Sequence, residues 1–166
     1  MNQIIVIRAI LDADEDVIRD VAIAGNSTLY DLHKLLVDAF ELSIGEMSSF
    51  FKSNENWDQG EEISMMDFNP ETGTNALEGV LLQDIFDAPK AKMLFAYDFL
   101  NLWTFYLEAR RIDEPKTAET YPSVLASLGR TPNKAPEKKI DPKSEDLESN
   151  IDDFDDSDFG SSEDWS

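Results

Sequence analysis

The chain has 166 residues, of which 35 are acidic and 14 basic, so its formal net charge is −21. A surface this negative repels phosphate groups, so we predict no direct binding to nucleic acid and no membrane association, and we expect basic protein surfaces as partners. The chain contains no cysteine, which excludes disulfides, thiolate nucleophiles and cysteine metal ligands.

The N-terminal segment predicts a β-hairpin. A nearly continuous β-branched run over 4–10 is typical of a strand buried on both faces, and an acidic turn at 12–16 separates it from a second apolar run at 17–24. The segment lacks the basic start of a signal peptide, and no apolar run approaches the roughly 20 residues that span a bilayer. We therefore predict a cytoplasmic protein.

A helix is predicted over residues 28–41, lying across the hairpin. Ser27 or Thr28 can cap it, and Asp31 falls in its first turn near the positive end of the helix dipole. Its apolar residues recur at helical spacing and form one broad stripe. The main positions of this stripe are Leu29, Leu32, Leu36 and Phe40.

The middle of the chain is less periodic. Residues 48–53 predict a short strand, and the polar stretch 54–79 predicts loops with one short extended piece. Residues 77–86 favour a short helix.

Two aromatic segments, 92–99 and 102–112, predict a second hairpin. Phe95, Tyr97 and Phe99 would share one face of the first strand, and alternate residues from Trp103 onward one face of the second. We expect Trp103 to be buried and Asn101 to supply the positive φ of the connection. One long amphipathic helix is the alternative, but aromatic and β-branched residues favour strands.

The C-terminal part divides the chain into two regions. Residues 121–129 predict a last extended segment, and from Thr131 onward proline, lysine and acids dominate, as in a linker. The prediction is an α+β domain over 1–130, with a β-hairpin followed by a helix (a β-grasp-like opening), then further antiparallel strands and a short helix. Residues 131–166 are predicted to be a disordered acidic tail.

Few residues suggest chemistry, and we predict no catalytic residue, no cofactor and no metal site. His33 could be a general base or a ligand, but a histidine hydrogen-bonded near the core is the commoner case. Asp98 and Glu108 could form a catalytic carboxylate pair, although 35 acids make chance neighbours common.

Two further features have a binding interpretation and a structural one. Arg110 and Arg111 could clamp an anion or could offset acidic neighbours at the end of a strand. Trp57 could stack on a ligand or fold back over the core.

The motifs resemble the plasmid pRiA4b ORF-3-like family over about residues 4–129. The stretches 17–19, 28–33 and 97–103, with Tyr121 and Pro122, carry the likeness. Ile18 stands where the family has tryptophan, Leu100 and Asn101 where it has Gly-Asp, and Glu46 and Phe105 where it has histidines. The family's cysteine-proline-rich end is absent. The resemblance implies an α+β fold with a β-grasp-like opening, no settled activity and an association with mobile elements.

The last 17 residues hold seven acids and no base, together with Phe154, Phe159 and Trp165. Acids alone suffice for solubility, so the three rings indicate partner-binding anchors on a flexible chain. The pattern is similar to the acidic, aromatic-ended tails of bacterial single-stranded DNA-binding proteins. We predict a non-catalytic interaction module whose tail engages basic partners. The alternatives are an enzyme with a carboxylate site, a mobile-element accessory protein, or a folded domain (the body, residues 1–130) that has no function of its own and charges that only confer solubility.

Overall fold

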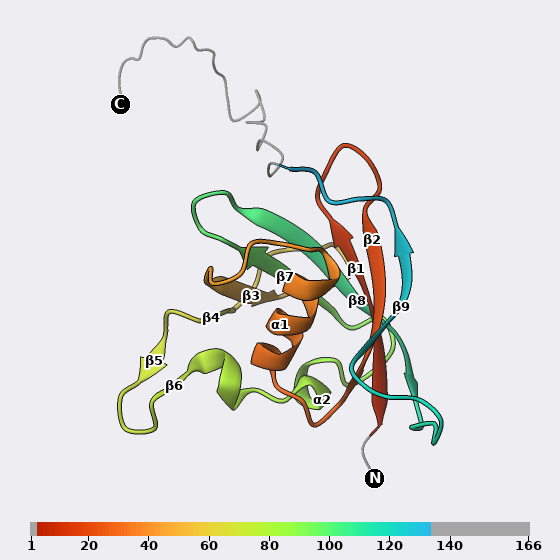
Figure 1. The fold of residues 1–166 in the computed structure, drawn as a ribbon. Helices are drawn as coiled ribbons and strands as arrows, with labels where there is room; N and C mark the ends of the chain where they lie inside the picture. The colour runs from red at the N-terminus through yellow and green to blue at the C-terminus, as the bar shows by residue number, and fades with distance from the viewer. Residues whose placement is uncertain (1–2, 134–166) are drawn as a thin grey trace. The chain divides into compact units, whose positions relative to one another are not determined.

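The computed structural model describes residues 3–133, so the predictions for the tail rings lie outside the described residues. One sheet of seven strands, in the order β4-β3-β7-β8-β1-β2-β9, dominates the fold, and every neighbouring pair is antiparallel (Figure 1). The few helices confirm the α+β class. The elements are β1 Ile4–Leu11, β2 Ile18–Ala24, α1 Leu29–Ala39, β3 Ser48–Lys52, β4 Glu62–Ser64, β5 Phe68–Asn69, β6 Thr74–Asn75, the 3₁₀ helix η1 Ala76–Gly79, α2 Leu82–Ile85, β7 Lys92–Tyr97, β8 Trp103–Asp113 and β9 Ser123–Leu128.

The predicted N-terminal hairpin is confirmed by the antiparallel pairing of β1 and β2. β1 lies inside the sheet between β2 and β8, and its side chains are buried on both faces, as its β-branched run predicts. Ile5 and Ile7 belong to the main core, whereas Ile4 and Val6 pack with Ala22 in a smaller cluster. Alternation along the strand therefore distributes one apolar run between two cores.

The predicted helix is α1, and it packs against one face of the sheet (Figure 1). Thr28 caps it: the Thr28 hydroxyl accepts from the Asp31 amide at 3.2 Å, and the Asp31 carboxylate accepts from the Thr28 amide at 2.9 Å. This reciprocal pair is the capping box that the sequence allows at this position. All four stripe positions named above are fully buried.

The second predicted hairpin is confirmed as β7 and β8, with Tyr97 opposite Trp103. Trp103 is buried, as expected. The prediction for the connection is wrong in two respects. Positive φ occurs at Asp98 and Leu102, not at Asn101. Because Asp98 leaves the extended conformation, the alternation stops at Tyr97, and the next aromatic residue, Phe99, is partly exposed instead of sharing the core face.

The short helix predicted over 77–86 is present only in part, because the structure divides this stretch into η1 and α2. Between them Val80 and Leu81 are extended. The Val80 carbonyl accepts from the Leu29 amide at 3.0 Å, and the Leu82 amide donates to the Ser27 carbonyl at 2.8 Å. Tertiary hydrogen bonds to the start of α1 therefore interrupt a helix that local propensity favours.

The polar stretch 54–79 holds three short strands, β4, β5 and β6, where one extended piece was expected. The last predicted extended segment is β9, which pairs with β2 and forms one edge of the sheet. None of the helices in residues 3–133 is both long and apolar enough to cross a membrane.

Candidate functional site

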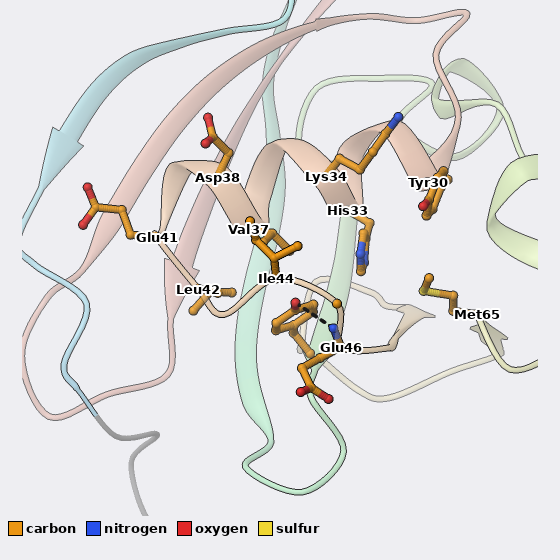
Figure 2. A pocket seen from close by; sticks show the side chains of 12 residues that line it. Tyr30, His33, Lys34, Val37, Asp38, Glu41, Leu42, Ile44, Glu46 and Met65 are labelled. Carbon is orange, nitrogen blue, oxygen red and sulfur yellow. Dashed lines mark hydrogen bonds between the residues drawn. The ribbon is translucent and has the colours of Figure 1, made fainter.

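A groove of about 630 Å³ runs beside α1 and is the candidate site. One wall is α1, another is the segment 41–46 that follows it, and Met65 and Tyr97 close the remaining side. Figure 2 shows His33 projecting from α1 toward Glu46 and Met65. The lining residues are Tyr30, His33, Lys34, Val37, Asp38, Glu41, Leu42, Ile44, Gly45, Glu46, Met65 and Tyr97.

His33 occupies the wall between the groove and the core, with 6% of its surface exposed. Its Nδ1 lies 2.6 Å from the Ser48 hydroxyl of β3. Three rings surround the imidazole: Tyr30 stacks on it at 5.6 Å between centroids, Tyr97 is tilted at 5.4 Å, and Phe95 meets it edge-on at 6.1 Å. These contacts confirm the interpretation of His33 as a hydrogen-bonded histidine near the core.

The surroundings of His33 keep its imidazole neutral. Burial, aided by the charge of Lys34, lowers the pKa of His33 from 6.5 to about 4. At neutral pH the ring therefore carries one proton, and it can offer one donor and one acceptor. A base with so low a pKa is weak, which is unfavourable for proton abstraction near pH 7.

We expect the single histidine of the chain to titrate near pH 4 in the folded protein, which an NMR pH titration of its ring protons measures directly. Because the unfolded state takes up this proton near pH 6.5, His33 should lower the free energy of unfolding as pH falls from about 6.5 to 4. Between pH 7 and 4.5, the free energy of unfolding of wild type should fall by roughly 1–2 kcal/mol more than that of His33→Gln. A titration midpoint near 6.5 would contradict this account.

Tyr97 ties the segment after α1 to the sheet. Its hydroxyl donates to the Ser43 carbonyl and accepts from the Glu46 amide at 3.2 Å, the bond drawn in Figure 2. Burial raises the pKa of Tyr97, so the hydroxyl keeps its proton at neutral pH. The wall of the groove at 43–46 is thus fixed by a buried side chain of β7.

The structure does not bring Asp98 and Glu108 together. Glu108 lies opposite Lys92, six residues before Asp98 along β7, which places the two acids roughly 20 Å apart at about 3.3 Å per residue. Asp98 caps its own turn, accepting from the Leu100 amide at 3.2 Å and from the Asn101 side chain at 2.6 Å. The proposed carboxylate pair is therefore wrong in its geometry.

Glu108 is held by cations rather than by another acid. It accepts from Lys92 at 3.0 Å and from Arg110 at 2.7 Å, and hydrogen bonds and charge from these two cations lower the pKa of Glu108 despite its partial burial. Arg111 pairs with Asp113 at 2.7 Å. The two arginines therefore offset acids at the end of β8, which confirms the structural interpretation of this pair.

Trp57 folds back onto the body, but on the sheet face opposite α1. Its ring meets Tyr106 edge-on at 5.1 Å between centroids, and the Lys92 ammonium lies 5.4 Å from its centre. Tyr106 alternates with the core residues Phe105 and Leu107, so it faces away from the helix.

Sequence reasoning missed the groove. Its walls come from separate stretches, and only His33 among its residues was singled out as a candidate site residue. Glu46 and Phe105 stand at two positions where the family that this sequence resembles carries histidine. Glu46 lines the groove, whereas Phe105 is fully buried in the core. Within residues 3–133 no group of three or more potential metal ligands is clustered.

Comparison with known proteins gives a family and a fold. The sequence pattern of the family described as "Plasmid pRiA4b ORF-3-like protein" matches residues 3–160. A solved structure of a protein of unknown function from Methanosarcina mazei Go1 is similar with a TM-score of 0.62 and 18% sequence identity, over 76% of this chain and 70% of that one. At this identity the similarity concerns the fold alone. No curated protein matches the chain.

Proposed function

The chain belongs to the plasmid pRiA4b ORF-3-like protein family, and from this premise we propose that it is a non-catalytic protein-interaction module for basic partners. In this proposal the acidic tail makes the first electrostatic contact, and Phe154, Phe159 and Trp165 anchor it in apolar pockets of the partner. The net charge of −21 supports a basic partner, because opposite charge accelerates encounter and excludes acidic competitors.

The main support for this proposal is that the reactive side chains singled out from the sequence make structural contacts within the folded domain. His33 is neutral and held by Ser48 and three rings, and Asp98 caps a turn. Glu108 forms ion pairs with Lys92 and Arg110, and Arg111 forms an ion pair with Asp113. The groups of the described residues that the sequence singled out for catalysis are thus engaged in holding the fold, which favours binding over reaction.

The test compares two variants of the full chain in quantitative pull-downs from native lysate. The first changes Phe154, Phe159 and Trp165 to serine and keeps every acid. We expect it to lose most specific partners, since aromatic anchors dominate small interfaces. Recovery of the same proteins at the same level would show that the rings are idle.

The matched control keeps the three rings and changes the acids at 152, 153, 155, 156 and 158 to asparagine or serine. We expect this variant to bind more slowly and with weaker salt dependence, because charge chiefly sets the association rate. Full binding by the serine variant together with loss of binding by this acid-substituted variant would instead indicate that the acids alone carry binding.

A further inference from the structure

The floor and one rim of the groove beside α1 are apolar. Val37, Leu42 and Met65 contribute partly or largely buried side chains, and Ile44 at the rim is 91% exposed. A single exposed isoleucine is ordinary, but this one continues the apolar lining of a hollow of ligand-binding size. The groove therefore offers apolar surface that a bound segment would remove from water.

One polar group opens into this apolar lining. His33 Nδ1 is occupied by Ser48, whereas no side chain in residues 3–133 is hydrogen-bonded to its Nε2. The neutral ring lines the groove and is more than nine-tenths buried. The Nε2 atom is a hydrogen-bond donor or an acceptor, according to the tautomer of the ring. A backbone amide of a peptide bound in the groove could form a hydrogen bond with it.

Carboxylates flank the groove on both sides. Figure 2 shows Asp38 and Glu41 standing along α1 and its end, and Glu46 across from the helix. The one cation of the lining, Lys34, is already engaged: its ammonium lies 3.7 Å from Asp31 and 5.0 Å from the centre of the Tyr30 ring. The local field therefore favours a positively charged occupant.

The groove is long enough for a peptide. Its lining follows α1 from Tyr30 to Asp38, a length of about 12 Å at 1.5 Å per residue. An extended chain covers this length with roughly four residues. An apolar side chain can then enter the floor while neighbouring residues reach the flanking acids.

We propose that this groove is the docking site for a segment of the basic partner, one that presents apolar side chains flanked by lysine or arginine. The inference rests on the proposed function and assigns to the folded body a site separate from the tail rings. The apolar floor takes the anchor, His33 meets the peptide backbone, and Asp38, Glu41 and Glu46 hold the flanking cations.

The experiment uses the full chain with ¹³C-labelled methionine methyl groups. Met65 lines the groove, whereas its neighbour Met66 is exposed outside it and Met93 is fully buried, so the chain contains its own controls. The probe is a synthetic peptide with two central leucines flanked by lysines. We expect a saturable shift of the Met65 signal and none of the Met66 signal. The matched peptides, with serine for leucine or glutamate for lysine, should leave Met65 unchanged.

Charge is tested by a triple variant of the flanking acids and a triple control elsewhere. Removing the three flanking charges should weaken binding about tenfold at low salt, whereas the control should bind as wild type does. The test variant is Asp38→Asn/Glu41→Gln/Glu46→Gln, and the control is Glu55→Gln/Glu71→Gln/Asp87→Asn.

The outcomes separate this inference from the proposed function. Met65 should still shift in the variant with serine at Phe154, Phe159 and Trp165. Fluorescence anisotropy of the labelled peptide is the second measurement of binding. If it showed binding without a Met65 shift, the peptide would bind elsewhere than in the groove, and only the proposed function as an interaction module would remain. A Met65 shift of equal size with the glutamate peptide would overturn the groove's preference for cations. Absence of binding by both measurements would overturn the groove proposal, whereas the pull-downs with the tail variants decide the proposed function independently.

Discussion

Phe95→Ala is expected to lower the free energy of unfolding by about 3–5 kcal/mol, the usual cost of a large-to-small change at a buried aromatic position. Phe95 is fully buried on β7, and its ring contacts Phe50 at 4.7 Å, Phe105 at 5.5 Å and His33 at 6.1 Å between centroids. Removing it leaves a cavity between α1 and the middle of the sheet. Since small domains are typically stable by roughly 5–15 kcal/mol, much of the margin would be lost.

Urea unfolding followed by circular dichroism measures this loss, and Phe99→Ala is the matched control. Phe99 is the same residue type four positions on, but it lies partly exposed in the turn after β7. Its truncation should therefore cost well under half as much. Similar losses for the two variants would mean that Phe95 is not at the centre of the core.

Arg19→Met is expected to cost about 2–4 kcal/mol, because a buried guanidinium joins three elements. Its Nε donates to the Ala39 carbonyl at the end of α1 at 3.0 Å, and its Nη1 donates to the carbonyls of Ile18 at 2.9 Å and Leu128 at 3.1 Å. The guanidinium also lies 5.2 Å from the centre of the Phe40 ring. Methionine fills a similar volume but cannot donate to these three carbonyls.

Arg19→Lys separates charge from geometry. An ammonium keeps the positive charge near the end of α1, yet it cannot reproduce the planar fork that reaches both Ala39 and Leu128. We expect an intermediate loss, together with faster hydrogen exchange of the β9 amides in both variants. An Arg19→Met protein as stable as wild type would show that the carbonyls find other partners at no cost.

Much of the fold could be predicted because burial repeats along the chain with the period of the local structure. The β7–β8 hairpin and α1 follow from apolar residues at spacings of two or of three to four, and the β1–β2 hairpin follows from a continuous β-branched run and the acidic turn after it. The capping box at Thr28 and Asp31 likewise lies within four residues. Information of this kind is present in any short stretch of sequence.

The errors occur where a distant contact overrides local preference. Residues 77–86 have helical character, but hydrogen bonds from the start of α1 divide them into η1 and α2. Phe99 continues the alternation of β7 in the sequence and leaves it in the structure, because Asp98 takes a positive φ and caps the turn. Asp98 and Glu108 looked suitable for one site, but the strand register separates them.

The sequence by itself determined the charge of the molecule, the exclusion of cysteine chemistry, the two hairpins and the helix, since each depends on composition or on neighbours within a few residues. Only the tertiary structure decided the candidate site. It placed Ser48 of β3 on the imidazole of His33, Tyr97 of β7 on the segment after α1, and Met65 at the far wall. These residues lie up to some sixty positions apart, and no periodicity links them. Packing α1 across an antiparallel sheet brings them together, and the same packing fixes the low pKa of the one histidine.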